Sequence, residues 1–410
     1  MPVPGRSAAD VVIVAATRSA VTRAGRGGLA GLRTDALAAQ VVAAALAQVP
    51  ALPPGLIEDL YLGCALPGGE QGFNLGRVVA VLLGLDRLPA ATVTRYCASS
   101  LQAVRMAAHA IRAREGRAFI VAGAESSSSR PRGHSDSLPG TKNPVFAAAE
   151  ARTAGAPARE RWRDPRAEDL LPDVYVDVNR TAENIAGLYG IARAEQDEYA
   201  VLSHRRARDA IAAGVLAAEI TPVACAGGTV VRADDGPRAD ATPEGLAALP
   251  PLLPDGTVTA GTCCKLADGA AALILTDRAL SDEHGLPVLA TVRGTGVAAL
   301  SPELMGLGTV PAVRRALRHS GLALSDIDLL ELNEEYAVQL LANQRDLGVP
   351  VERLNVHGGA LALGHPFGMT GIRMICTLLG ALRRNDASTG LVATPAGGGQ
   401  GMAVVVARES

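Results

Sequence analysis

Apolar positions recur with helical spacing in the stretch that follows residue 98. One apolar face repeats at steps of three, four and three residues: Leu101, Val104, Ala108 and Ile111. This spacing predicts an amphipathic helix. Just before it, the β-branched run 92–94 predicts a buried strand. We therefore expect a strand-to-helix turn at Cys97, with Ser99 and Ser100 capping the first helical turn.

The same pattern occurs a second time near the C-terminus. The echo of the helical face is Ile372, Ile375, Leu379 and Leu382. Two apolar runs are also repeated, because residues 57–64 resemble 327–334 and residues 119–125 resemble 391–397. All three pairs are offset by 270 to 272 residues. Each copy has the order strand, helix, strand, helix, strand, which predicts a mainly parallel sheet covered by helices. Two such halves would pack around a pseudo-twofold axis.

A segment of different character separates the two copies. Residues 127–170 are rich in Ser, Pro, Arg and Gly, residues 181–214 are strongly helical, and residues 232–254 are polar and Pro-rich. Insertions of this kind commonly form a lid or a binding surface. We therefore expect three units. Residues 1–126 with 258–286 form the first half, residues 127–257 form an inserted loop domain, and residues 287–410 form the second half.

Composition narrows the class of protein. The chain has 410 residues, 48% of them hydrophobic and 3% aromatic, with a net charge of −2. This is typical of a soluble globular protein without electrostatic bias toward nucleic acid or membrane. The six cysteines include no CxxC pair, which favours a reducing cytosol. Neither a metal-ligand spacing, nor a signal peptide, nor a membrane-spanning run is visible in the sequence.

Cys97 is the first candidate for chemistry. At the start of a helix a thiol meets unpaired N–H groups and the positive end of the helix dipole, which should lower its pKa and favour thiolate. A small buried apolar residue is the alternative interpretation. His365 precedes the second-copy helix, so the duplication places it opposite Cys97, where it could take the thiol proton. A turn histidine beside a proline is the alternative here.

Further candidates follow strands of the second copy or lie in the insertion. Asn333 could hold a water or donate to a carbonyl oxygen, although a strand-end cap is the simpler role. The glycine run that begins at Gly397 could direct backbone N–H groups at an oxyanion, although tight turns also need glycine. Arginines of the insertion could contact phosphates or form a solvated surface: Arg152, Arg159, Arg161, Arg163, Arg166 and Arg238. A cysteine–histidine protease or amidase is the rival nucleophilic interpretation. The duplication and the shortage of aromatic residues argue against it.

The motifs CASSLQAV, NEEYA, GHPFG and GGGQG occur in the order, spacing and halves of the thiolase family, which the chain resembles over nearly its whole length. Further matching stretches are EQGFNLGR (70–77), TAEN (181–184), the DDGPR stretch ending at Arg238, DGTVTAG (255–261), DGAAALIL (268–275) and NVHGGALALGHP (355–366). The resemblance implies an α/β thiolase fold, duplicated in five α-β-α-β-α layers, with an inserted loop domain that binds coenzyme A. It also implies a cytoplasmic homodimer or homotetramer whose substrate is a coenzyme A or carrier thioester. No bound cofactor, nucleic acid partner or membrane partner is expected.

The resemblance also assigns roles to residues. Cys97 would be the nucleophile that carries the acyl group, and His365 would activate it. His365 and a water held by Asn333 would form one oxyanion hole, and the backbone N–H groups of Cys97 and Gly397 would form the other. Arg238 would lie near the adenosine end of coenzyme A. Cys264 would border its pantetheine arm, and Glu335 and Tyr336 are expected to belong to the same binding site.

The chain departs from the family pattern at the second catalytic cysteine, which is replaced by Pro395. In the family that thiol removes the α-proton of the second acyl-CoA, and proline cannot. Losing a positioned acid or base costs roughly 10²–10⁴ in rate. Other departures surround the expected site. Cys264 stands where serine is usual, Glu335 and Tyr336 replace alanine and phenylalanine, and residues 179–180 break a glycine pattern.

Three functions remain open on these grounds. The first is an acyltransferase whose acyl-Cys97 intermediate reacts with an altered acceptor: an amine, a hydroxyl, a thiol carrier or a decarboxylating malonyl-type nucleophile. The second is a conventional acetyl-CoA acetyltransferase or 3-ketoacyl-CoA thiolase with a substitute base, drawn from Glu335, Cys264 or Cys376. The third is a non-catalytic homologue that serves as a scaffold.

Overall fold

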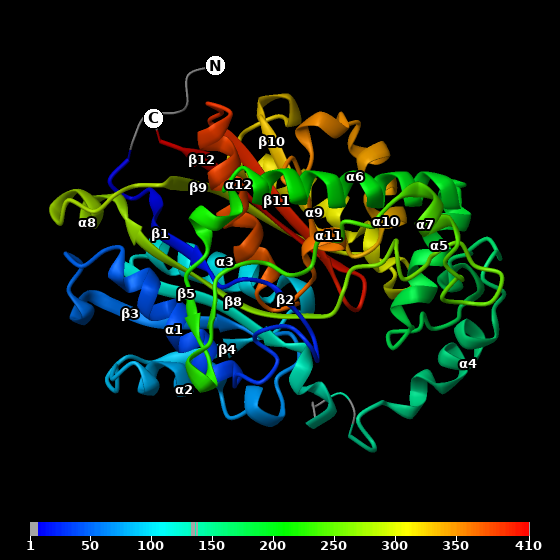
Figure 1. Ribbon diagram of the computed structural model, residues 1–410, viewed down its shortest axis with the longest axis horizontal. Helices are drawn as coiled ribbons and strands as arrows, with labels where there is room; N and C mark the ends of the chain where they lie inside the picture. The colour runs from blue at the N-terminus through cyan, green and yellow to red at the C-terminus, as the bar shows by residue number, and fades with distance from the viewer. Residues whose placement is uncertain (1–6, 133–135, 137, 410) are drawn as a thin grey trace.

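The two repeated halves each contribute a group of strands to one ten-stranded sheet (Figure 1). The computed structural model describes residues 7–132, 136 and 138–409. The first half supplies β1 (Val11–Arg18), β2 (Thr22–Arg23), β3 (Ile57–Gly63), β4 (Ala90–Val93), β5 (Ala118–Ser126) and β8 (Ala267–Asp277). The second half supplies β9 (Ala290–Ala299), β10 (Leu329–Leu332), β11 (Thr389–Ala396) and β12 (Gln400–Arg408). The order is β10-β11-β12-β9-β1-β8-β5-β3-β4, with β2 paired to β8, so the two halves meet at the β9–β1 pair.

The expectation of a mainly parallel sheet is wrong. β3 runs parallel to β4 and β5, and β10 runs parallel to β11. The remaining neighbours, including the β1–β9 junction, are antiparallel. The reason is visible at β11 and β12, because a tight glycine turn joins them and can only reverse the chain direction. The sequence pattern had not revealed that β8 and β12 return against the parallel strands.

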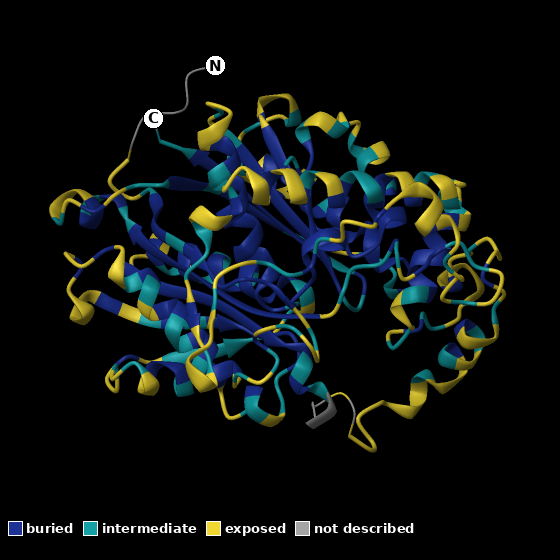
Figure 2. Ribbon diagram, viewed as in Figure 1, coloured by how far each residue is buried: buried dark blue, intermediate teal, exposed yellow. Residues whose placement is uncertain are grey.

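Helices cover the strands in layers, and the buried residues mark the spaces between the layers. Outer helices α1 (Thr34–Ala47) and α2 (Leu75–Leu82) cover the first half, and α9 (Thr309–Ser320) and α10 (Ala337–Leu347) cover the second. Helices α3 (Ser99–Ala113) and α12 (Thr370–Arg384) lie in the middle, between strands of both halves. Figure 2 shows this interior as nearly continuous buried ribbon. The layers agree with the five-layered fold expected from the resemblance.

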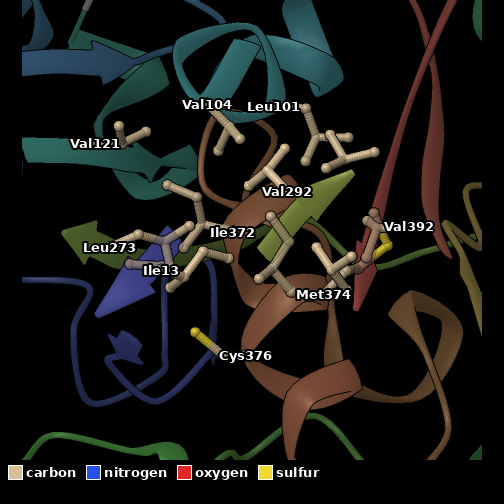
Figure 3. Close-up of a cluster of buried hydrophobic side chains, with 14 of the residues drawn as sticks. Ile13, Leu101, Val104, Val121, Leu273, Val292, Ile372, Met374, Cys376 and Val392 are labelled. Atoms are coloured by element: carbon tan, nitrogen blue, oxygen red, sulfur yellow. The ribbon is translucent and has the colours of Figure 1, made fainter. Parts of the chain in front are cut away.

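Side chains that alternate along each strand fill the cores on both faces of the sheet. In β1, Val11 and Ile13 pack against the middle helices, whereas Val12 and Val14 pack against the outer helices. Because side chains of a strand alternate between its two faces, an unbroken apolar run serves two layers at once. Figure 3 shows the middle layer, where side chains from β1, α3 and α12 meet.

The two middle helices touch at their N-terminal ends. The Ser100 hydroxyl accepts a hydrogen bond from the Ile372 backbone N–H at 3.2 Å. A Cβ on Gly371 would lie 2.5 Å from the Leu101 side chain, so only glycine allows this approach. The helical face predicted in the first copy is buried, and in the second copy only Leu379 keeps partial exposure. Both helix predictions are therefore confirmed, and the contact brings the Cys97 and His365 turns together.

The insertion leaves the sheet after β5 and returns to it through β8. Its elements are α4 (Ala147–Gly155), α5 (Val178–Tyr189), α6 (Arg193–Ala212), β6 (Val223–Ala224), β7 (Val230–Val231) and α7 (Pro243–Ala247). The helical character expected for 181–214 is thus confirmed as two helices. Two short helices remain. α8 (Arg278–Glu283) connects β8 to β9, and α11 (Ala360–Leu363) lies between α10 and α12 in the second half. No helix in the described part of the chain is long and apolar enough to cross a membrane.

A buried ion network fastens the insertion to the sheet. Arg18, at the end of β1, has no exposed side-chain surface. Its guanidinium donates two hydrogen bonds to Asp234, at 2.7 and 2.9 Å, and one to Glu219 at 2.6 Å. Both carboxylates belong to the insertion, so one cation from the first half holds two of its segments in place.

Candidate active site

The Cys97 turn has the expected place but not the expected details. β4 lies at the edge of the sheet and is half-buried rather than buried, since it has a strand neighbour on one side only. A short 3-10 turn at Tyr96–Ala98 leads from β4 into α3. The helix cap is Ala98, without a side-chain hydrogen bond, so the serine caps predicted from the sequence are wrong. The Ser99 hydroxyl instead accepts from the Arg95 N–H at 2.8 Å and donates to the Tyr96 carbonyl at 2.6 Å.

Three chemically reactive side chains converge at this turn. The Cys97 sulfur, a Glu335 carboxylate oxygen and a His365 ring nitrogen all lie within 4.8 Å of one another. They come from the 3-10 turn, from the segment between β10 and α10, and from the segment between α11 and α12. Sulfur, carboxylate and imidazole are also donor types that bind Zn²⁺. No sequence spacing predicts this set, because the three residues are far apart in the chain.

Hydrogen bonds fix the orientation of the His365 ring. Its Nδ1 lies 2.7 Å from the Thr370 hydroxyl, which itself donates to the Pro366 carbonyl at 2.9 Å. The hydroxyl must therefore accept from Nδ1–H, which leaves Nε2 as the acceptor nitrogen of the ring, and this nitrogen faces the cluster. Asn333 Nδ2 lies 3.2 Å from Nε2. Sequence reasoning missed Thr370, although its place five residues after His365, at the start of α12, was an available signal.

Glu335 is held in the middle of the cluster. Its side chain is 4% exposed, and its Oε1 lies 3.3 Å from Asn333 Nδ2 and 3.5 Å from His365 Nε2. The preceding Glu334 anchors the segment, because its buried carboxylate accepts hydrogen bonds from Tyr199, Ser203, Asn355 and the Leu361 backbone. The residue that breaks the family pattern thus faces the nucleophile directly.

The Cys97 thiol is not the activated thiolate that the helix start predicted. Burial, followed by the negative charge of Glu335, raises its pKa well above the usual value. The residue as a whole keeps partial exposure, while the sulfur lies in the cluster. Desolvation and a neighbouring carboxylate outweigh the helix dipole here, because both disfavour the charged form. The thiol is therefore protonated at rest.

The glycine loop lies against the residue that precedes the nucleophile. A Cβ on Gly397 would lie 2.9 Å from the Tyr96 ring, so the absence of a side chain lets the loop approach. Tyr96 has a positive φ of 45°, an unusual conformation for a bulky residue, and such strain occurs at functional turns. Pro395 is buried in β11 and pairs with Gly401 of β12. Proline offers no group that can accept or release a proton.

The other departures lie just behind Glu335. The Cys264 backbone N–H donates to the Glu335 carbonyl at 2.9 Å, and the backbones of Cys263 and Tyr336 pair in an isolated antiparallel β-bridge. The Tyr336 ring is buried, and its hydroxyl donates to Asn179 Oδ1 at 2.8 Å. The hydroxyl is therefore committed to the insertion. Assigning Tyr336 and Cys264 to coenzyme A binding remains a prediction.

Cys376 does not belong to the site. Figure 3 shows it on α12 among apolar side chains of the middle layer, where it is 4% exposed. Burial raises the pKa of its thiol far above the usual value. It is therefore excluded as a substitute base.

Cationic side chains gather beside the site. Lys265 is bound to the active-site segment, because its carbonyl accepts from the His365 N–H at 2.9 Å. Its ammonium donates to the Gly236 carbonyl at 2.8 Å, two residues before Arg238. Burial, with the positive charges of Arg238 and Arg23, lowers the pKa of Lys265 to about 8. Sequence reasoning missed Lys265, although its position next to Cys264 was a signal.

Arg238 and the other arginines have different surroundings. Arg238 is exposed, and its backbone N–H donates to His204 Nδ1 at 3.1 Å. Arg152 pairs with buried Glu303 at 2.5 Å, and Arg159 donates to the Asp255 carbonyl at 2.7 Å. Arg161 and Arg163 line a cavity of about 290 Å³ on the insertion, whereas Arg166 is exposed. Sequence reasoning placed these six side chains in one group, but the structure brings only Arg152, Arg161 and Arg163 together, at this cavity.

Comparison with known proteins places the chain in one family. The model of the thiolase N-terminal domain matches residues 11–279, and that of the C-terminal domain matches residues 286–408. A 3-ketoacyl-CoA thiolase of Bacillus subtilis is 38% identical, covering 97% of this chain and 98% of its own. An acetyl-CoA acetyltransferase of Pseudomonas aeruginosa is 40% identical, with 98% and 100% covered.

Solved structures agree in fold. The dimeric peroxisomal thiolase of Saccharomyces cerevisiae superimposes with a TM-score of 0.88 at 30% identity, covering 99% of each chain. The Bacillus anthracis acetyl-CoA acetyltransferase gives 0.85 at 33% identity, covering 98% of this chain and 99% of its own. With both halves matched and the fold shared, the chain belongs to the thiolase family.

Proposed function

We propose that this thiolase-family acyltransferase captures an acyl group on Cys97 and delivers it to an acceptor other than the α-carbon of a second acyl-CoA. The donor is an acyl-CoA or a carrier thioester. One observation carries the proposal. Cys97, His365 and Asn333 are assembled, whereas Pro395 lies where the family resemblance places the base for carbon–carbon chemistry.

The first half-reaction uses groups that are in place. His365 Nε2 faces the cluster and is the ring nitrogen that does not bond Thr370, so it can accept the Cys97 proton as the sulfur attacks the thioester carbonyl. The same nitrogen then returns the proton to the departing coenzyme A thiolate. Because the pKa of Cys97 is raised by burial and by Glu335, this assistance is required at neutral pH.

The second half-reaction is where the chain differs. Removing an α-proton needs a base beside the acyl-CoA carbon, and residue 395 supplies none. Hydrogen bonding to Cys263 and burial raise the pKa of Cys264 well above its usual value, which makes it a poor substitute. An acceptor that carries its own acidic hydrogen avoids the difficulty.

A conventional thiolase with Glu335 as substitute base is the second candidate. The observation that favours it is the position of the carboxylate, within 4.8 Å of the Cys97 sulfur. The names of the relatives, 3-ketoacyl-CoA thiolase and acetyl-CoA acetyltransferase, agree with it. Against it, Glu335 lies within hydrogen-bond distance of the Asn333 amide that would otherwise bind the enolate oxygen. A scaffold role has less support, because it leaves the assembled cluster unexplained.

Coenzyme A binding and dimer formation complete the proposal. Lys265 and Arg238 place positive charge beside the site, where phosphates of coenzyme A would be attracted. Two surface features favour a second copy as partner. Phe73 is 97% exposed, and β4 has no further strand on its outer side among the described residues.

Mass spectrometry of the intact protein tests the proposal. After exposure to acetyl-CoA, we expect one added acetyl group that is absent from Cys97→Ala; no adduct with any acyl-CoA would favour the scaffold. Thiolysis of acetoacetyl-CoA is expected to be slow, and Pro395→Cys should raise it by about tenfold or more. Thiolysis at a normal thiolase rate in the unchanged protein would favour the conventional reaction.

A further inference from the structure

The hydrogen-bond donors beside Cys97 are already engaged. Asn333 Nδ2 lies 3.3 Å from Glu335 Oε1 and 3.2 Å from His365 Nε2, so its two hydrogens both have acceptors. His365 adds no donor, because its only N–H is held by Thr370. An enolate oxygen needs converging donors to be stabilised. The resting site does not offer them from these side chains.

Hydrogen-bond acceptors are instead in excess. The Glu335 carboxylate is buried in the cluster, and its two oxygens can accept more hydrogen bonds than the one from Asn333 Nδ2. Asn333 Oδ1 is also buried and has no hydrogen-bond partner among the described residues. A buried acceptor without a partner is unfavourable, and a ligand with N–H or O–H groups relieves that cost.

The charged side chains that act on the Cys97 thiol itself are negative, whereas the positive charges of Lys265 and Arg238 lie beside the cluster. Glu335 and Glu125 are the two ionisable side chains that raise the pKa of Cys97 through their negative charge. Such a site attracts a cation and repels an anion. A malonyl-type carboxylate is therefore disfavoured as the acceptor, and an ammonium group is favoured.

We infer that the acceptor of the acyl-Cys97 intermediate is a primary amine that enters as its ammonium ion, so that the product is an amide. This inference rests on the proposed capture of the acyl group at Cys97. An ammonium ion has three N–H donors, and the two carboxylate oxygens of Glu335 and Asn333 Oδ1 provide three acceptors. An alcohol has one donor, and the α-carbon of an acyl-CoA has none.

The transfer balances without another reactant. Glu335 takes one proton from the ammonium group, and the freed nitrogen attacks the thioester carbonyl. His365 takes a second proton from that nitrogen as the carbon–sulfur bond breaks. One of these protons passes to the Cys97 thiolate and the other leaves to solvent. The result is an amide, a regenerated thiol and one released proton.

The test starts from protein that carries an acetyl group on Cys97 and has been separated from excess acetyl-CoA. Equal amounts of this protein are mixed with n-butylamine, n-butanol, fresh acetyl-CoA or buffer alone. Loss of the acetyl group is followed by intact mass, and N-acetylbutylamine is quantified by chromatography and mass spectrometry. We expect n-butylamine to accelerate deacetylation about tenfold or more over buffer, and n-butanol and acetyl-CoA to have little effect.

Glu335→Gln is the matched variant, because it keeps the shape of the side chain and removes its charge. Starting from the same amount of acetyl-protein, its reaction with n-butylamine should be slower by roughly 10²–10⁴, and Glu335→Asp should recover part of the loss. Equal acceleration by butanol, faster reaction with acetyl-CoA, or full amine reactivity in Glu335→Gln would overturn the inference. Failure to form acetyl-Cys97 at all would instead overturn the proposed function.

Discussion

Tyr336 donates its hydroxyl hydrogen to Asn179 Oδ1 at 2.8 Å, and both residues depart from the pattern of the thiolase family. Tyr336 immediately follows Glu335, and Asn179 lies in the first turn of α5 in the insertion. The two departures therefore compensate each other, since a phenylalanine at 336 would leave Asn179 without this donor. The changes around the site form a connected set rather than scattered losses.

A double-mutant cycle measures this connection. Tyr336→Phe and Asn179→Ala each remove one side of the hydrogen bond, and each should lower the free energy of unfolding by about 1 kcal/mol. The double variant should lose less than the sum, with a coupling of about 0.5–1.5 kcal/mol in urea unfolding. Strict additivity would mean that the two residues are independent.

The protonation state of Cys97 predicts how alkylation depends on pH. Since burial and Glu335 raise the pKa of this thiol, its reaction with iodoacetamide should keep rising above pH 8.5 instead of reaching a plateau there. Glu335→Gln removes a negative charge, so the pKa falls and the plateau moves to lower pH. The rate is read from the mass of the peptide that contains Cys97, which separates it from the other five cysteines. A plateau near pH 7 in the unchanged protein would contradict the prediction.

The lowered pKa of Lys265 predicts that the KM for acetyl-CoA depends on pH. Its pKa of about 8 means that the ammonium loses its charge as the pH rises through that value. If Lys265 and Arg238 attract coenzyme A phosphates, the KM for acetyl-CoA should increase between pH 7 and 9, measured by acylation rates. Lys265→Met should raise the KM at pH 7 and flatten this increase. An unchanged KM in the variant would remove Lys265 from the binding surface.

Replacing Arg18 should greatly lower the free energy of unfolding. Arg18→Ala leaves Asp234 buried without its cation, and breaking such a buried pair costs about 3–5 kcal/mol. Arg117→Ala is the matched control, because Arg117 also binds two carboxylates but is 43% exposed. Its cost should stay below about 1 kcal/mol. Thermal unfolding compares the two variants, and similar losses would contradict the role assigned to the Arg18 network.

Local patterns were enough to predict the helices, because apolar spacing alone specifies which face of α3 and α12 is buried. They also located the Cys97 turn and, through the duplication, placed His365 opposite it. Strand direction escaped prediction, since periodicity is the same in parallel and antiparallel strands. The direction of the Cys97 pKa shift was predicted wrongly, because its largest cause is burial and its second is the charge on Glu335, which comes from more than two hundred residues away in the chain. The sequence identified Asn179 as unusual for the family, but only the three-dimensional structure shows that its partner is Tyr336.

Ser126, the last residue of β5, lies opposite Asp268 at the start of β8. The roughly 140 residues between them therefore leave the sheet and rejoin it at adjacent positions of two paired strands. A graft from a relative could replace residues 127–257 without moving any strand of the ten-stranded sheet, provided that it keeps the carboxylates that meet Arg18. Substrate preference can thus change by exchange of this one contiguous segment, while the Cys97 thiol and the His365 imidazole keep their positions in the two halves.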